Sequence, residues 1–164
     1  MKISIKRYIG NVFFDILPSS SYWLKRHIAR WMGVQVSSEV KLNIGCKFYG
    51  EGPIIIEDDT WVGPNVFFYT ARDSGIFIGK NCDIAPDVRF VCGSHNIGNR
   101  ERRAGAGTAG DIQVLDGCWV GFGSKIFPSL IGNASIIAAG SVVLENIDSN
   151  TLAGGVPAKR IREL

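Results

Sequence analysis

Large aliphatic or aromatic residues return every six positions along most of this chain. The run from Val114 to Val143 shows the spacing, with a small residue near the fifth position of each hexad. This period predicts a parallel β-helix, in which each short strand turns one large side chain toward a shared core. The anchor residues group into five triplets: Val36, Leu42, Phe48; Ile56, Val62, Phe68; Ile78, Ile84, Phe90; Val114, Val120, Ile126; Ile131, Ile137, Val143.

Inside each triplet the spacing is six residues. Extra residues occur only between triplets, after Phe48, Phe68 and Phe90, and the spacing drops to five after Ile126. We therefore expect about five coils of three short strands, with the length variation near one corner of a triangular prism. A single coil cannot bury its anchors alone, so the core forms only by stacking.

Residues 1–33 follow a helical spacing instead. Pro18 and the serines after it divide this stretch into two predicted helices, the second ending at Gly33. Their apolar stripes are Ile5, Ile9, Val12 and Ile16, then Leu24, Ile28 and Trp31. The repeat ends after Asn150. The chain thus divides into a helical segment (1–33), an all-β β-helix domain (34–150) and a short basic tail (151–164).

Charge is concentrated at the N-terminus. The chain has a net charge of +3, and residues 1–31 contain six Lys or Arg but only one Asp. Such a basic, amphipathic segment is compatible with docking on an anionic membrane surface. The simpler interpretation, which we favour, is a cap over the open end of the first coil. No apolar run reaches the ~18–20 residues of a spanning helix, and no signal peptide is recognisable.

The four cysteines do not form a recognisable disulfide set. Three of them take the small position of a hexad, where a buried thiol packs like a small apolar group. This usage favours a reducing cytoplasm, at most at the inner face of a membrane. With only two histidines and no second ligand pair, we expect no metal site. We also expect no nucleic-acid partner.

The largest interruption of the repeat is the loop 96–111, which follows His95 directly. Its glycine-rich part predicts mobility, and long loops on rigid scaffolds often carry function. Arg100, Arg102 and Arg103 offer planar donors for a carboxylate or phosphate of an acceptor. A solvated insertion without a role is the alternative.

His95 lies at a coil corner, at the root of this loop. A neutral imidazole can accept a proton near neutral pH, so His95 is the candidate general base. His27, in the middle of a predicted helix, is expected to be structural. Cys92 and Cys118 lack a convincing partner base, which disfavours a covalent cysteine intermediate.

Four segments carry a resemblance to a known family. They are Gly93-Ser94-His95-Asn96, Val114 to Gly121, Ile131 to Val143, and Ala153 to Arg162. Together they resemble the hexapeptide-repeat acetyltransferases, in particular galactoside and maltose O-acetyltransferases and capsule or lipopolysaccharide O-acetyltransferases. The likeness covers residues 34–164, and the combination of repeat, histidine and basic tail is more specific than any single hexad.

The resemblance implies a left-handed β-helix homotrimer with active sites between subunits and acetyl-CoA as co-substrate. His95 matches the general base for direct transfer to a sugar or glycan hydroxyl. Asn65 matches an acceptor-orienting residue, and backbone amides near Gly121–Gly123 are expected to stabilise the oxyanion. The acetyl-CoA residues it implies are Trp119 beside the thioester, Gly121, Phe122, Ala139 and Gly140 along pantetheine, and Lys159 and Arg162 near the phosphates.

Some features depart from the family or leave alternatives open. Leu144-Glu145 replaces a frequent Thr-Lys pair, which removes one expected phosphate contact. If residues 158–164 are helical, Lys159 and Arg162 face the same phosphate. A non-catalytic scaffold, an N-acetyltransferase acting on an amino sugar, and a β-helix metalloenzyme resembling γ-carbonic anhydrases are the alternatives. The last needs three histidines, and the predicted β-helix has only His95.

Overall fold

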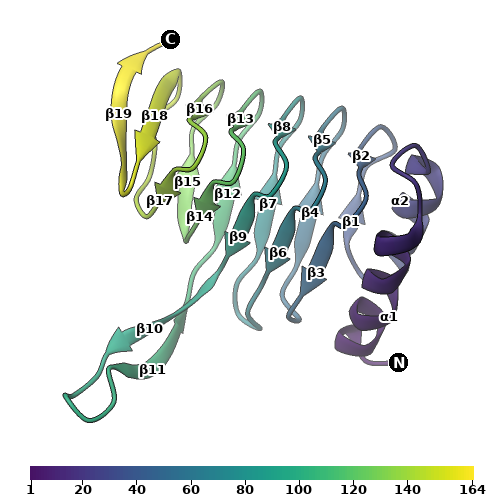
Figure 1. Ribbon diagram of the computed structural model, residues 1–164, viewed down its shortest axis with the longest axis horizontal. Helices are drawn as coiled ribbons and strands as arrows, with labels where there is room; N and C mark the ends of the chain where they lie inside the picture. Colours follow the sequence, from purple (N-terminus) through teal and green to yellow (C-terminus); the bar gives the residue numbers. More distant parts are fainter.

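The chain winds into a stack of triangular coils, with two helices lying across its N-terminal end (Figure 1). The computed structural model describes residues 1–164. Corresponding strands of successive coils pair in parallel, forming three sheets that we call A, B and C.

Five coils contribute one strand to each sheet, as the triplets predict. Sheet A contains β1 (Gln35–Val36), β4 (Ile54–Ile56), β7 (Ile76–Ile78), β12 (Ile112–Val114) and β15 (Ser129–Ile131). Sheet B contains β2 (Lys41–Leu42), β5 (Trp61–Val62), β8 (Asp83–Ile84), β13 (Trp119–Val120) and β16 (Ile136–Ile137). Sheet C contains β3 (Lys47–Tyr49), β6 (Phe67–Tyr69), β9 (Arg89–Val91), β14 (Lys125–Ile126) and β17 (Val142–Val143).

The predicted anchors form the core. All fifteen are buried, and each pairs in register with the anchor of the next coil, as Phe48 does with Phe68 and Phe68 with Phe90. These three rings stack with centroids 5.1 and 5.2 Å apart. The repeat therefore builds a continuous ladder of identical contacts, which no single coil could form.

Two of the three corners are tight turns. The corner from sheet B to sheet C contains one residue with positive φ in every coil, and the corner from sheet A to sheet B contains one in every coil but the first. Glycine and asparagine adopt this conformation most readily. At the corner from sheet B to sheet C these residues are Gly45, Asn65, Asp87, Gly123 and Gly140. The third corner, from sheet C to sheet A, takes the insertions, as the spacing predicts.

The tail differs from the prediction. The stack continues beyond Asn150, because β18 (Thr151–Gly155) pairs in parallel with β16 and places Ala153 on Ile137. The chain then reverses, and β19 (Ala158–Glu163) pairs antiparallel with β18. The helix considered for residues 158–164 is thus wrong: a strand here pairs the edge that β18 would otherwise leave open.

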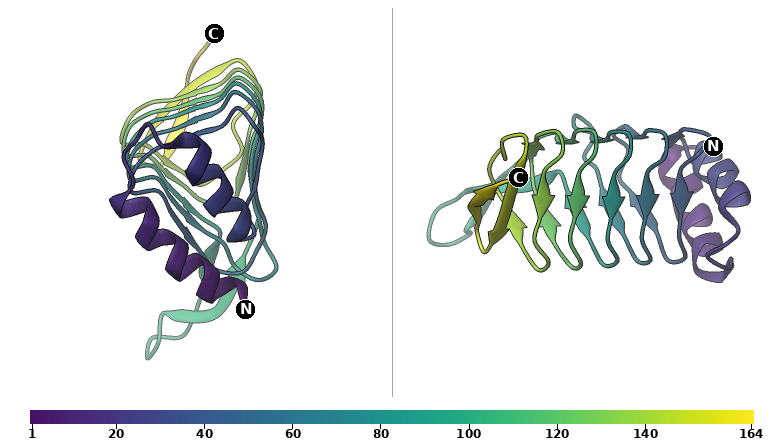
Figure 2. Two further views of the ribbon diagram at one scale, coloured as in Figure 1. Left: turned by 90° about the vertical axis from the view of Figure 1, so that its right-hand side faces the viewer. Right: turned by 90° about the horizontal axis from the view of Figure 1, so that it is seen from above.

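Helices α1 (Ile3–Ile16) and α2 (Tyr22–Trp31) confirm the predicted N-terminal cap. Figure 2 shows them crossing the end of the prism. Neither is long and apolar enough to span a membrane.

The face that α1 buries is not the predicted apolar stripe. Its buried residues are Arg7, Gly10, Asn11 and Phe14, whereas Ile5, Ile9, Val12 and Ile16 are exposed. The first coil has no preceding coil to pair its backbone groups, and polar side chains supply the partners.

The guanidinium of Arg7 donates to the carbonyl oxygens of Gly50 at 2.8 Å and Gly52 at 2.9 Å. Asn11 both donates to the Phe48 carbonyl and accepts from the Phe48 amide, at 3.1 and 2.9 Å. Arg30 donates to the Val36 carbonyl at 2.7 Å. Much of the N-terminal basicity therefore serves to cap the coils.

Candidate active site

The corner between sheets B and C aligns most of the residues assigned to acetyl-CoA. Gly121 N donates to Ile137 O at 2.8 Å, and Gly140 N donates to Phe122 O at 2.8 Å, so successive coils are stitched together here. A Cβ on Gly121 would lie 2.6 Å from Ala139 N, which excludes any larger residue at this close approach. We call this row of turns the B–C corner.

Several backbone amides at the B–C corner make no hydrogen bond within the chain. Those of Phe122 and Ala139, the second corner residues of the fourth and fifth coils, are among them. In the second and third coils the same position is Pro64 and Pro86, which have no N–H. The second and third coils therefore have no donor at this position, whereas the fourth and fifth coils keep an unpaired N–H there.

The hydrogen bonds at this corner also narrow the set of expected oxyanion donors. The Gly121 and Gly123 amides are both used in coil-to-coil bonds, the latter to Pro86 O at 3.0 Å. Phe122 alone of the three has a free N–H. Its side chain is 56% exposed and that of Trp119 is 53% exposed, so two aromatic side chains flank the free amides.

Asn65 occupies the same corner two coils earlier, with φ of +57°. The Arg89 guanidinium donates to the Asn65 carbonyl oxygen and lies 3.8 Å from the centroid of the Phe67 ring. The Asn65 amide side chain makes no hydrogen bond within this chain and lies against Gly45. Its position is thus fixed while its amide stays available for a ligand.

Lys159 lies near the C-terminal end of this row. It pairs with Gly154 across the β18–β19 hairpin, and its Nζ is 2.9 Å from Glu145 Oε2. Arg162 pairs with Leu152, farther along the hairpin. This segment is a strand, so the helical spacing does not apply. The register shift between Leu152 and Ala153 nevertheless pairs Arg162 and Lys159 with Leu152 and Gly154, which lie two residues apart on one face of β18.

The predicted mobile loop is instead a hairpin that projects from the stack (Figure 1). Strands β10 (Gly93–Ile97) and β11 (Ala104–Ala109) pair antiparallel, with His95 opposite Gly107. Arg100, Arg102 and Arg103 lie in the turn at its tip. Arg103 is the one that bonds back, to Gly98 O at 3.3 Å.

The hairpin also orients the imidazole of His95. Nδ1 lies 3.0 Å from Gly105 O. A carbonyl oxygen only accepts, so this bond requires the proton on Nδ1 and leaves the lone pair of Nε2 free. His95 is exposed, so Nε2 can reach an acceptor hydroxyl. His27 shows the expected structural contact, with Nδ1 2.8 Å from Trp23 O in its own helix.

One chain does not bring His95 and the B–C corner together. The hairpin leaves the stack after β9, at the far edge of sheet C, and the B–C corner lies at the near edge. The width of sheet C separates the candidate base from the candidate acetyl-CoA residues.

The cysteines are poorly placed for nucleophilic chemistry. Cys92 and Cys118 are both buried. Burial raises the pKa of the Cys92 thiol and raises that of Cys46 to about 12, which disfavours the thiolate at both positions. The hydrogen bond with the Cys82 thiol lowers the pKa of Cys118, which is buried and has no histidine or carboxylate bonded to it as a base. No group of three or more His, Cys, Asp or Glu residues is arranged to hold a metal ion.

The sequence was compared with those of known proteins. No protein-family model matches the sequence. The chain is 33% identical to the galactoside O-acetyltransferase of Escherichia coli over 124 residues. The aligned region covers 75% of this chain and 54% of the relative. Curated relatives of comparable identity are matched over only about half their length.

Solved structures extend the likeness to the whole chain. A hexapeptide-repeat acetyltransferase of Vibrio cholerae, determined with acetyl coenzyme A, has a TM-score of 0.83 at 24% identity, covering 99% of this chain and 87% of that one. A maltose O-acetyltransferase of Clostridium difficile has a TM-score of 0.64 at 26% identity, covering 99% and 88%.

The chain resembles the hexapeptide-repeat acetyltransferases in sequence and in fold. The fold prediction of a left-handed β-helix is thereby confirmed. Two features of the site could not have been found by matching motifs. The free amides of Phe122 and Ala139 depend on coil-to-coil pairing, and the Gly105 carbonyl depends on the hairpin.

Proposed function

We propose that this chain is an acetyl-CoA-dependent O-acetyltransferase that acetylates a hydroxyl of a sugar or glycan precursor. The observation that carries the proposal is the His95–Gly105 hydrogen bond, which holds Nε2 as an exposed proton acceptor on a projecting hairpin. The likeness to a galactoside O-acetyltransferase supports the acceptor class. Free thiols and acetyl-CoA chemistry are typical of the cytoplasm, where we place the reaction.

The active site lies between two subunits of a homotrimer in this proposal. One subunit supplies His95 on its hairpin, and its neighbour supplies the B–C corner. The separation of these two features across sheet C supports the sharing. The hairpin carries Ile97, which is 90% exposed in the single chain, a further sign that another surface covers it.

The B–C corner suits the pantetheine arm and thioester of acetyl-CoA. The free amide of Ala139 can donate to a pantetheine carbonyl, and the exposed Trp119 ring can pack along the thioester arm. The open space at Gly140 allows close approach, because no atom lies within 4 Å of a Cβ built there. Lys159 and Arg162 supply positive charge for the phosphates.

Transfer is direct in this proposal. Nε2 of His95 removes the proton from the acceptor hydroxyl as its oxygen attacks the thioester carbonyl carbon. The free Phe122 amide donates to the oxyanion that forms. When the carbon–sulfur bond breaks, the coenzyme A thiolate takes the proton from Nε2, and the acetyl ester is released.

Asn65 and the hairpin arginines are assigned to the acceptor. The unbonded amide of Asn65 can hold a sugar hydroxyl. The side chains of Arg100 and Arg102 make no hydrogen bond or ion pair within the chain, and both are exposed at the hairpin tip with Arg103. Three guanidinium groups favour an acceptor that carries a carboxylate or phosphate.

A thiol-release assay tests the proposal. Purified protein is incubated with acetyl-CoA and a panel of neutral sugars, sugar acids, sugar phosphates and amino sugars. Thiol release with a hydroxyl acceptor, and an ester in the product, is expected. Release confined to amino sugars with an amide product would establish N-acetylation instead. No release above hydrolysis with any class would favour the scaffold.

Replacing Lys159 with alanine is expected to raise the KM for acetyl-CoA a few-fold to about tenfold, with kcat little changed. A phosphate contact far from the thioester binds substrate and transition state alike, and one exposed charge contributes about 1 kcal/mol. Arg162→Ala should act in the same direction. The matched control is Arg160→Ala, whose side chain pairs with Glu163 at 3.2 Å. A lower melting temperature with unchanged KM would instead assign the tail to closing the last coil.

A further inference from the structure

The outer face of the helical cap is apolar and uncovered. Because α1 turns polar residues toward the coils, its apolar side points outward. Tyr8 is 75% exposed, Ile16 is 67% exposed and Trp23 is 65% exposed. We call the whole set the apolar end face: Ile5, Tyr8, Ile9, Val12, Phe13 and Ile16 of α1, and Trp23, Leu24, Ile28 and Trp31 of α2. Soluble proteins rarely leave such a contiguous patch without a partner.

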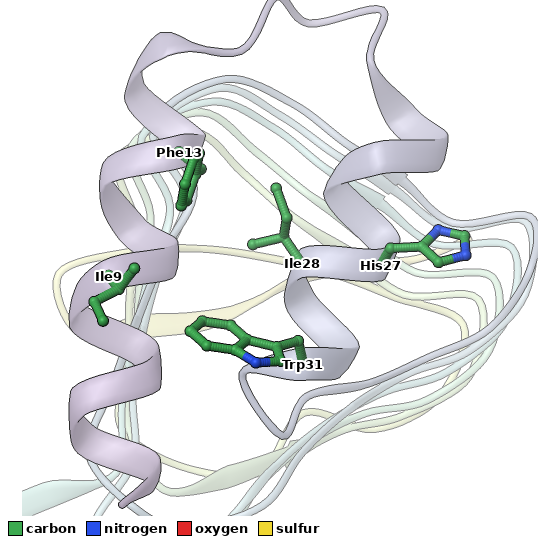
Figure 3. Close-up of a pocket in the computed structure, with 5 residues that line it drawn as sticks. All are labelled: Ile9, Phe13, His27, Ile28 and Trp31. Atoms are coloured by element: carbon green, nitrogen blue, oxygen red, sulfur yellow. The ribbon is translucent and has the colours of Figure 1, made fainter. Parts of the chain in front are cut away.

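A groove runs between the two helices within this face. Figure 3 shows Ile9 and Phe13 of α1 and Ile28 and Trp31 of α2 turned toward it, with the coils behind the helices. His27 points away from the others. The groove has a volume of about 430 Å³ and is open to solvent. In Figure 2 the helices lie across the end of the prism, so this face looks outward along the prism axis.

Positive charge borders the apolar end face. Lys6 Nζ lies 5.8 Å from the centroid of the Trp31 ring, and Lys2 is exposed one turn earlier. The only acidic residue in this segment, Asp15, is ion-paired with Lys47. The border is therefore cationic around an apolar centre.

We propose that the apolar end face docks on the interface of an anionic membrane, with both helices lying in the plane of the headgroups. Amphipathic helices with basic borders bind membranes by burying their apolar side at the acyl boundary. Tryptophan and tyrosine, which this face exposes, are the side chains enriched at that depth. A second copy of the chain fits less well, because stacking two such faces would bring their cationic borders together.

The proposed docking does not depend on acetyl transfer. Membrane binding would nevertheless be stronger in the proposed homotrimer. Three prisms with parallel axes would present their end faces to one plane, so weak single contacts would add through multivalency. The membrane would then lie at the N-terminal end of the stack, with the hairpins projecting from the sides.

Vesicle co-sedimentation tests this docking. Full-length protein is mixed with vesicles of phosphatidylcholine alone or with about one third phosphatidylglycerol, at low and high salt. We expect sedimentation with the anionic vesicles, weakened by salt because the charges are exposed. The double substitution Tyr8→Ser with Trp23→Ser should reduce partitioning about tenfold or more, since two large apolar side chains are lost.

Matched controls separate docking from loss of structure. Phe77, which is 47% exposed on sheet A, provides Phe77→Ser as the apolar control, and melting temperatures are compared for all variants. The proposal requires that Phe77→Ser binds like the wild type. It is overturned if the wild type stays in the supernatant, or if the double variant binds equally well. It is also overturned if ultracentrifugation without lipid shows that the double variant dissociates a larger assembly, because a protein surface then covers the face.

Discussion

Replacing His95 with alanine is expected to lower kcat for acetyl transfer by ~10²–10⁴, the usual contribution of a general base. The imidazole lies on the exposed side of a hairpin, and its one hydrogen bond, to Gly105 O, serves to orient it. The fold does not depend on it, so assembly and acetyl-CoA binding should persist. Steady-state kinetics by thiol release, with binding of acetyl-CoA measured separately, gives both quantities.

The matched control is His27→Ala. His27 also bonds a carbonyl oxygen through Nδ1, at 2.8 Å, but within its own helix in the cap. Its loss should leave kcat near the wild-type value. If His95→Ala retains more than about half the activity, the base lies elsewhere, and a carboxylate of the 96–111 segment becomes the candidate.

Replacing Arg7 with alanine is expected to lower the free energy of unfolding by about 3–5 kcal/mol. Arg7 is 2% exposed, and its guanidinium is the donor for the Gly50 and Gly52 carbonyl oxygens and for Thr70 Oγ1. Burial lowers the pKa of this guanidinium, which nevertheless stays charged. Without it, the carbonyl oxygens of Gly50 and Gly52 lose their shortest hydrogen bonds at the end of the first coil.

Urea denaturation measures this loss. Arg72→Ala is the matched control, because the Arg72 side chain is 81% exposed and makes a single ion pair with Glu51 at 3.4 Å. The control should change the free energy of unfolding by no more than about 0.5 kcal/mol. A comparable small change in Arg7→Ala would mean that water replaces the guanidinium and that α1 is not a structural cap.

The repeat predicts the core well because each anchor is set by local strand geometry that recurs in every coil. Phe48, Phe68 and Phe90 stand at the same position of successive hexads and stack as expected. The corners follow for the same reason, since a tight turn needs a residue that tolerates positive φ. Nothing in either feature depends on contacts between distant, dissimilar segments.

The hydrophobic pattern fails to predict which helix face is buried where unpaired backbone groups of the neighbouring coil require polar side chains as partners. An apolar stripe on a helix usually faces the protein, but the surface under α1 is the open end of a coil, which needs donors and acceptors. Arg7 and Asn11 therefore turn inward.

The sequence pattern also fails to predict the hairpin. Gly and Ala have low strand propensity, so 104–109 suggests a loop until pairing with β10 is seen.

The candidate site is predictable only in part. Motif matching indicates Trp119, Gly121 and His95, but it does not give the Gly105 carbonyl that selects the tautomer of His95. It also indicates the stretch from Gly121 to Gly123 without showing that Phe122 has the one free amide. Both facts depend on hydrogen bonds between segments.

Subunit mixing tests whether the active site is shared between His95 of one subunit and the B–C corner of its neighbour. His95→Ala removes the base, and Ala139→Trp places a bulky side chain at an exposed position of the corner. Each variant alone should be inactive. Differently tagged subunits are co-expressed, and mixed trimers are purified through both tags.

In every mixed trimer that carries both tags, one of the three sites combines an intact His95 with an intact B–C corner from the neighbour, which is about one third of the sites. We expect the purified mixed trimers to regain roughly that fraction of wild-type activity. Mixed trimers that remain inactive would contradict a shared site, and would require the base and the acetyl-CoA residues to act within one chain.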